Sequence, residues 1–174
     1  LNSVTPTLLN GATASSDGAI VRLSTDGRSL LSVTRVGDRV LDLAIDANDN
    51  IVVSLWQQGM LALNPEADMI RWQATPGSVL RVDAGNGVSG ETAVLVTSSN
   101  DPDSSTPGNG TILLYEADGD LIDSFAGRHS TLDVCLDDAS QTVNYIGWRQ
   151  ASVDGVPVQI AYLRGTAYDG SEKW

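Results

Sequence analysis

Residues 19–32 read "AIVRLSTDGRSLLS", in which two short apolar runs flank the acidic turn "STDG". An Asp-Gly pair between two alternating apolar runs is a strong hairpin signal, because glycine adopts the positive φ of tight turns without steric cost. These residues therefore predict two antiparallel strands joined at Gly27.

The same form occurs three more times along the chain. The segments are 59–72 ("GMLALNPEADMIRW"), 111–124 ("TILLYEADGDLIDS") and 160–174 ("IAYLRGTAYDGSEKW"). The four turn positions, about 40 to 52 residues apart, are Gly27, Ala67, Gly119 and Gly170. Self-similarity at such a period is the sequence signature of a repeat architecture.

A second family of segments lies between these hairpins. It comprises residues 39–56 ("RVLDLAIDANDNIVVSLW"), 78–98 ("SVLRVDAGNGVSGETAVLVTS") and 130–148 ("STLDVCLDDASQTVNYIGW"). Leu41, Leu80 and Leu132 align in these segments, and so do Leu43, Val82 and Val134. The alternation around them is typical of strands with one buried face, and each segment passes through a polar turn into a second strand.

Two strands from each family give four antiparallel strands per repeat, with almost no helical periodicity. This pattern predicts an all-β fold, a β-propeller of about four blades, because propeller blades are four-stranded sheets of this length. The blades are expected near residues 1–34, 35–73, 74–126 and 127–174.

Three segments complete this expectation. Residues 1–9, "LNSVTPTLL", are expected as the second strand of the first blade, and the Pro-, Gly- and Ser-rich segments 98–110 and 149–157 as surface loops.

A closed ring usually has four to eight blades. The chain is therefore part of a larger seven- or eight-bladed ring, a compact four-bladed ring or a unit that associates with other copies. The larger ring is expected, since both termini cut through repeats.

Residues 15–54, "SSDGAIVRLSTDGRSLLSVTRVGDRVLDLAIDANDNIVVS", resemble the bacterial seven-bladed propeller repeat called SBBP. Residues 61–72, "LALNPEADMIRW", and 167–174, "AYDGSEKW", are similar to the repeats of PQQ-like propellers, where a Trp ends the outer hairpin. The resemblance implies a propeller fold. Such repeats occur in scaffold proteins, envelope assembly factors and quinoprotein enzymes, so the resemblance implies no individual site residue.

The formal charge of −12 limits the classes of partner. A negative potential repels phosphate backbones and anionic membrane surfaces, so nucleic acid is not expected as a partner. No apolar run approaches the roughly 20 residues that span a bilayer, so membrane insertion is not expected either. The acidic surface and polar loops favour an extracellular, periplasmic or cell-surface location.

Residues 46–50, "DANDN", match the start of the calcium-loop pattern with Asp46, Asn48 and Asn50. That pattern requires Gly at its sixth and Glu at its twelfth position, where this chain has Ile51 and Gln57. Turn chemistry between two strands explains these residues without an ion. No cofactor is therefore predicted. Calcium is a weaker alternative, both here and at the loop that carries Asp101 and Asp103.

Two similar triplets stand where second strands are expected to end. They are Trp56, Gln57 and Gln58, and Trp148, Arg149 and Gln150. An aromatic ring beside amide and guanidinium donors is suited to stacking on and hydrogen-bonding a sugar or a peptide. The alternative is that each Trp packs between neighbouring blades, because large aromatics mostly serve core packing.

Catalysis has little support in the sequence. His129 is the only histidine and no nucleophile motif accompanies it. The single cysteine, Cys135, is predicted to be a small buried hydrophobe. We therefore expect a non-enzymatic structural platform that binds proteins or glycans, or that binds the remaining blades or a second copy. The alternative is part of a propeller enzyme, quinoprotein-like or polysaccharide-active, whose catalytic residues lie outside this chain.

Overall fold

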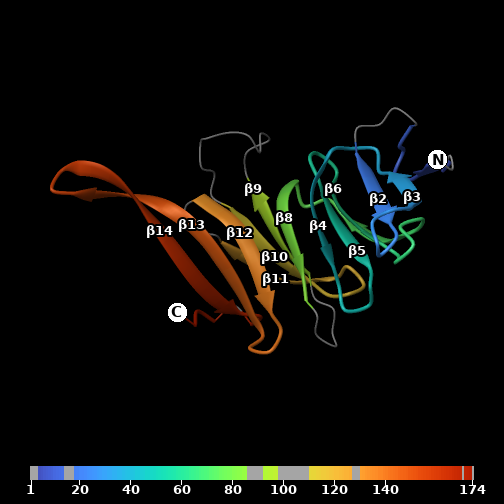
Figure 1. Cartoon of the computed structure of the whole chain (residues 1–174). Coiled ribbons are helices and arrows are strands. Elements are labelled where there is room, and N and C mark those ends of the chain that lie inside the picture. Colours follow the sequence, from blue (N-terminus) through green and yellow to red (C-terminus); the bar gives the residue numbers. More distant parts are fainter. Residues whose placement is uncertain are drawn as a thin grey trace.

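The computed structural model describes residues 4–13, 18–85, 92–97, 110–126, 130–169 and 171–173. Within these ranges all regular structure is β, and the strands form four sheets that follow one another along the chain (Figure 1). The all-β prediction is confirmed. No helix within these ranges is long and apolar enough to cross a membrane.

The first sheet has three strands in the order β1-β3-β2. They are β1 (Thr7–Leu8), β2 (Ala19–Leu23) and β3 (Leu30–Arg35). β1 pairs in parallel with β3, so the prediction that residues 1–9 form a second strand beside β2 is wrong. A turn at Asn10 and Gly11, both with positive φ, redirects the chain after β1. Within the described residues, β2 is therefore an unpaired sheet edge.

The other sheets are antiparallel and run in sequence order. The second sheet contains β4 (Val40–Ile45), β5 (Ile51–Leu55), β6 (Gly59–Leu63) and β7 (Ile70–Ala74). The third contains β8 (Ser78–Ala84), β9 (Thr92–Thr97), β10 (Thr111–Tyr115) and β11 (Leu121–Ala126). The fourth contains β12 (Ser130–Asp137), β13 (Thr142–Val153) and β14 (Val156–Ala167).

The first strands of the second, third and fourth sheets share one irregularity. The pairing register shifts between Val40 and Asp42, between Val79 and Arg81, and between Thr131 and Asp133. The residues passed over are the three aligned leucines, Leu41, Leu80 and Leu132. A bulge of this kind adds one residue to a strand and bends it. The sequence alignment therefore corresponds to equivalent positions in three sheets.

The predicted hairpin turns are confirmed at three of their four positions. Gly27, Ala67 and Gly119 have φ of 69°, 59° and 95°. The backbone N–H of each donates a hydrogen bond of 2.8–3.0 Å to the carbonyl three residues earlier. Gly170 lies outside the described residues. Ala67 is fully buried, so this turn places its methyl group in the core despite the left-handed backbone.

The expectation that residues 149–157 form a loop is wrong. β13 and β14 pair without interruption from Thr142 opposite Ala167 to Val153 opposite Val156. Asp154 and Gly155, with φ of 52° and 81°, close them as a two-residue turn. Positive φ at both central residues defines the hairpin turn that Asp-Gly favours. The result is a long two-stranded ribbon that extends beyond the body of the molecule (Figure 1).

Three apolar layers lie between successive sheets. Between the first and second sheets pack Ile20, Val36, Ile51, Val53, Leu55, Leu61, Leu63 and Ala67. Between the second and third pack Val52, Met60, Ala62, Val79, Val82, Ala84 and Tyr115. Between the third and fourth pack Ile112, Leu114, Phe125, Val134, Val143 and Tyr145. Burial of apolar surface on both faces of the middle sheets is what holds the four sheets in a row.

Polar side chains reinforce these layers by bonding to the backbone of the next sheet. Asp42 Oδ2 accepts a hydrogen bond from the Val82 N–H (3.2 Å), and Asp83 Oδ2 accepts one from the Leu136 N–H (2.8 Å). The Trp72 indole N–H donates to the Ala117 carbonyl (2.8 Å). Each of these bonds fixes the register of one sheet on another, which apolar packing alone specifies less well.

Candidate functional site

The first predicted triplet forms the connection between β5 and β6. Trp56, Gln57 and Gln58 span it, and Gly59 follows with φ of 81°. A Cβ added at Gly59 would lie 2.2 Å from the Ala74 carbonyl oxygen, so only glycine fits this backbone path. The connection is therefore short and tightly packed against the end of β7.

Asp38 fixes the backbone of this connection. Its Oδ2 accepts hydrogen bonds from the N–H groups of Gln57 (2.6 Å) and Gln58 (3.0 Å). Its Oδ1 accepts one from the Arg39 N–H (2.7 Å). One carboxylate thus ties the segment between β3 and β4 to the β5–β6 connection. Charge-assisted bonds of this kind are stronger than neutral ones.

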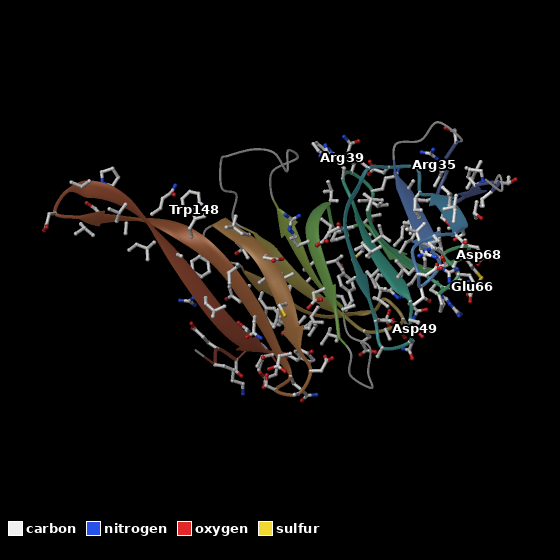
Figure 2. All side chains as sticks on the ribbon, viewed as in Figure 1. Arg35, Arg39, Asp49, Glu66, Asp68 and Trp148 are labelled. Atoms are coloured by element: carbon white, nitrogen blue, oxygen red, sulfur yellow. The ribbon has the colours of Figure 1, made fainter. Side chains whose placement is uncertain are left out.

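Arg39 covers one face of the Trp56 ring. Its guanidinium carbon lies 4.7 Å from the ring centroid, and its carbonyl accepts the Trp56 N–H at 3.0 Å. Trp56 is half-buried, whereas Gln57 and Gln58 are exposed. The Gln58 amide oxygen also accepts a hydrogen bond from the Asn10 side chain. A cation, an aromatic ring and two side-chain amides therefore share one edge of the second sheet (Figure 2 labels Arg39).

The second predicted triplet is placed differently. Trp148 lies inside β13, opposite Ser130 and Ala161, and does not end a strand. It belongs to the fourth sheet (Figure 2), whereas Trp56 lies in the β5–β6 connection of the second sheet. The side chains of Arg149 and Gln150 lie outside the described part of the structure. The two triplets, similar in sequence, therefore occupy different structural positions and do not form one site.

The "DANDN" segment is the turn between β4 and β5, as predicted. Asp46 Oδ1 accepts hydrogen bonds from the N–H groups of Asn48 and Asn50, both at 2.8 Å. Asp46 Oδ2 accepts one from the Asn50 side-chain amide at 2.9 Å. Asp101, Asp103 and His129 lie outside the described residues. Among the residues that are described, no three His, Cys, Asp or Glu side chains gather as a metal site.

The prediction that Cys135 is buried is wrong. Cys135 is exposed on the face of the fourth sheet that points away from the third. The bulge at Leu132 changes the alternation of β12, so that Val134 faces the core and Cys135 does not. Neighbouring groups partly shield the thiol from water, and this desolvation raises its pKa. The negative charge of Asp83 raises the pKa further. A raised thiol pKa disfavours the thiolate, which is the nucleophilic form.

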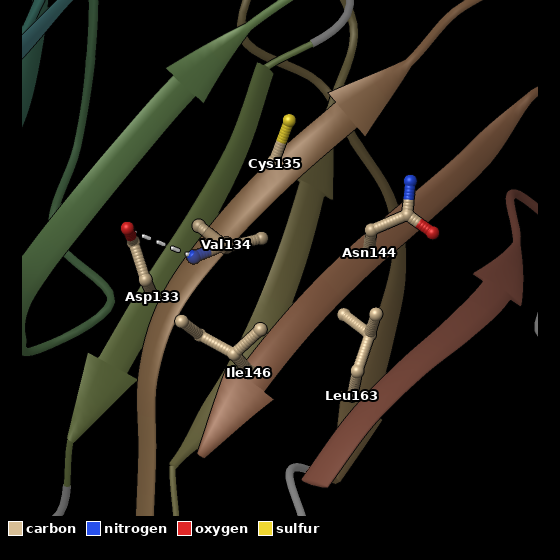
Figure 3. A pocket seen from close by; sticks show the side chains of 6 residues that line it. All are labelled: Asp133, Val134, Cys135, Asn144, Ile146 and Leu163. Carbon is tan, nitrogen blue, oxygen red and sulfur yellow. Dashed lines mark hydrogen bonds between the residues drawn. The ribbon is translucent and has the colours of Figure 1, made fainter.

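A shallow pocket surrounds Cys135. Asp133, Val134, Cys135, Asn144, Ile146 and Leu163 line it (Figure 3). Ile146 and Leu163 expose about half of their surface there (46% and 56%), and the Asn144 Oδ1 has no hydrogen-bond partner. The pocket is mainly apolar and lacks a set of groups that could carry out a reaction.

A larger groove on the opposite side of the molecule was not anticipated. It runs between β2 and β4, lined by Ile20, Val21, Arg22, Leu43, Ile45, Asp49, Ile51 and Pro65. The sequence did contain a sign of this groove. Leu43 aligns with Val82 and Val134, and a strand before β2 is needed to cover the Leu43 side chain. The expectation that residues 1–9 supply that strand concealed the gap.

No protein-family model matches the chain, and no curated protein matches it. Solved structures do match. One is the complex of KlAtg21 with the coiled coil of AgAtg16, with a TM-score of 0.57 and 12% sequence identity over 88% of this chain. Atg21 is a β-propeller protein. The chain spans half (50%) the length of the chain that it matches. At this identity the likeness concerns the fold, a succession of antiparallel sheets.

Proposed function

We propose that this chain is part of a β-propeller, with the four sheets as its blades, and that it acts as a non-enzymatic platform for binding another protein. Two observations support the propeller. The first strands of three sheets carry a bulge at the same position, so the sheets repeat one structural plan. The likeness to a propeller protein covers most of the chain.

The observation that carries the binding function is the geometry around Trp56. Trp and Arg are the side chains that most often dominate protein interfaces. Arg39 and Trp56 are stacked together, and the Asp38 carboxylate holds the backbone of the adjacent exposed residues Gln57 and Gln58. A surface ordered before binding loses less conformational entropy when a partner docks.

The net negative charge of the molecule favours a positively charged partner. A formal charge of −12 attracts positively charged surfaces and increases their rate of encounter. We therefore favour a basic protein segment as the ligand of the Trp56 surface. The similar solved structure is itself a complex with a coiled coil, which supports a protein partner rather than a small molecule.

The proposal includes a secreted or cell-envelope setting, supported by the acidic composition and by the resemblance of residues 15–54 to SBBP repeats. In such a setting the platform would organise other proteins around a rigid frame and carry out no chemistry of its own.

The experiment is a binding screen of the full chain against arrays of basic, neutral and acidic peptides and against a glycan array. We expect binding to basic peptides, weakened at least about tenfold by Trp56→Ala and by Arg39→Ala, as for interface anchors that cost about 1.4 kcal/mol or more. Trp148→Ala is the matched control and should bind as the parent does. Equal binding by Trp56→Ala, or binding to glycans alone, would refute the proposal.

A further inference from the structure

The groove between β2 and β4 marks a place where two strands are missing from a repeated plan. β6 forms a hairpin with β7 and pairs along its other edge with β5. In the same way, β10 forms a hairpin with β11 and pairs along its other edge with β9. β2 belongs to the same type of hairpin, since Gly27 occupies the turn position of Ala67 and Gly119. Within the described residues, however, β2 pairs only with β3, so the positions of a first and a second strand are empty in this sheet.

The side chains that those strands would cover are exposed. Leu43 exposes 46% of its surface, whereas its structural equivalents Val82 and Val134 expose 6% and 5%. Ile45 exposes 54%, whereas its equivalent Ala84 exposes 6%. In the third sheet the same positions pack against the first and second strands of the sheet before it. The groove is thus an unfilled copy of an interface that the molecule forms elsewhere.

The β13–β14 ribbon has the opposite property, because it is two strands without a sheet to cover them. β12 pairs with β13 only as far as Trp148, so residues 149–153 have a free edge among the described strands. Val153, Val156 and Ile160 expose 54%, 60% and 38% of their surface. An isolated two-stranded ribbon is at best marginally stable in water. The ribbon therefore gains stability if its apolar face is buried.

The pairing register places the apolar residues at the tip of the ribbon on one face, and the pair of Arg149 and Ile160 follows on the same face toward the base. Val153 stands opposite Val156, and Ala151 opposite Val158, on one face of the ribbon. Ser152 stands opposite Pro157 on the other face. Successive side chains on a strand alternate between faces, so Val153, Val156, Ala151 and Val158 share a face with Tyr162, which packs in the core. At its tip the ribbon is therefore apolar on the face that points, at the base, toward the third sheet.

We propose that two copies of this chain exchange ribbons, so that the β13–β14 ribbon of each inserts into the β2–β4 groove of the other and supplies the two missing strands. The free edge of β13, residues 149–153, is five residues long, as is β2, Ala19–Leu23. Second and third strands pair antiparallel in the other sheets, so β13 takes the position of the second strand beside β2 and β14 that of the first.

This arrangement points the apolar face in the required direction. In its own sheet β14 lies on the outer side of β13, whereas in the groove it lies on the inner side. With the direction of β13 unchanged, the ribbon is rotated by half a turn about its length. The face that points toward the preceding sheet in its own molecule then points toward the following sheet in the partner, where Leu43 and Ile45 are exposed. Strand addition also satisfies the backbone groups of the β2 edge.

The test is the oligomeric state of the full chain, measured by native mass spectrometry and sedimentation. We expect a dimer that Val153→Asp/Val156→Asp and, separately, Leu43→Asp/Ile45→Asp dissociate at least about tenfold more readily, since each places charge in an apolar contact. Ser152→Asp/Gln159→Asp adds the same charge to the opposite face of the ribbon and should leave the dimer intact. Circular dichroism establishes that each variant is folded.

Mixing the two disruptive variants provides a second measurement. The ribbon of the Leu43→Asp/Ile45→Asp chain and the groove of the Val153→Asp/Val156→Asp chain are both intact. A mixed dimer therefore keeps one undamaged contact and forms at concentrations where neither variant dimerises alone. A parent that is monomeric at all concentrations, a dimer insensitive to both variants, or no mixed dimer would overturn the proposal. Peptide binding at Trp56 is measured in a separate experiment. The binding proposal and the dimer proposal can therefore each fail without affecting the test of the other.

Discussion

Asp42 and Asp133 occupy the same position of two different sheets, directly after the β-bulge of the first strand, but only Asp42 bonds to a neighbouring sheet. Each uses Oδ1 to accept the N–H of the next residue, at 2.9 Å for Asp42 and 3.0 Å for Asp133. Asp42 Oδ2 also accepts the Val82 N–H of the third sheet at 3.2 Å. Comparing the two residues therefore distinguishes the effect of a hydrogen bond within one strand from that of a hydrogen bond between two sheets.

Asp42→Ala should destabilise the fold by about 1–3 kcal/mol, because it leaves a partly buried backbone N–H without an acceptor. Asp133→Ala should change stability by less than about 0.5 kcal/mol, as is usual for exposed positions. Urea denaturation of both variants measures the difference. Equal losses of stability would show that the link between the sheets contributes nothing.

Gly119→Ala should be more damaging than Gly27→Ala, although both residues have positive φ in equivalent turns. A Cβ at Gly119 would lie 2.8 Å from the Trp72 ring, whereas a Cβ at Gly27 meets no atom within 4 Å. Gly27→Ala should cost about 1–2 kcal/mol for the left-handed backbone alone. Gly119→Ala adds overpacking of about 1–3 kcal/mol and shifts the Trp72 ring.

Thermal unfolding measures both glycine variants, and the NMR signal of the Trp72 indole N–H reports the shift of its ring. Similar melting temperatures for the two variants would mean that the Trp72 ring moves aside without cost. Trp72→Phe in the Gly119→Ala background is a further check, because it removes part of the ring that the new methyl group meets.

Ser24→Ala should raise the pKa of Asp26. The Ser24 hydroxyl donates to Asp26 Oδ1 at 2.6 Å, and the Arg28 N–H donates to the same atom at 3.1 Å. These bonds, that of Ser24 foremost, lower the pKa of the carboxyl below its ordinary value. A carboxyl whose pKa is lower in the folded state stabilises the fold above the pKa of the unfolded chain. That contribution is lost as the pH falls through the folded value.

Carbon-detected NMR titration of the Asp26 carboxyl provides the measurement. Asp137 is the matched control, because a hydrogen bond from the Ser140 hydroxyl is the main cause of its lowered pKa. Ser24→Ala should leave the pKa of Asp137 unchanged, and Ser140→Ala should raise that of Asp137 alone. An unchanged Asp26 pKa in Ser24→Ala would contradict the assigned cause.

Cys135 should react slowly with thiol reagents for an exposed cysteine, because burial from its surroundings and the charge of Asp83 raise its pKa. Asp83→Asn should lower the pKa and move the pH profile of alkylation to lower pH. The rate of carbamidomethylation between pH 7 and 10 measures this shift. Asp154→Asn, at the tip of the ribbon, is the control and should leave the profile unchanged.

Local turn chemistry was the part of the fold that the sequence made predictable. Asp-Gly at Gly27 and Gly119, and the equivalent Ala67, indicated left-handed turns that the structure contains. The aligned leucines Leu41, Leu80 and Leu132 indicated equivalent strands, although the structure places them at bulges that interrupt the alternation, and Leu132 is 52% exposed. These signals are local, so they do not depend on how the sheets are placed.

The errors concern how far strands extend, which strands pair and which segments are structurally equivalent. Residues 149–157 have the composition of a loop, but Asp154 and Gly155 adopt a two-residue turn and the flanking residues continue as strands. β1 pairs with β3 although its sequence permits pairing with β2. The similarity of the Trp56 and Trp148 triplets suggested equivalent sites, yet one closes a connection and the other lies within a strand. Three-residue similarity does not encode these differences.

The position of the four sheets in a row has a consequence for how the molecule comes apart. Each apolar layer joins only neighbouring sheets, so the cohesion of the molecule is a sum over successive contacts, as in a linear array of coupled units. β5 and β6 are buried along their whole length and lie near the middle of this array. Opening is therefore expected to start at the outer sheets and progress inward, and amide hydrogens should exchange last in β5 and β6.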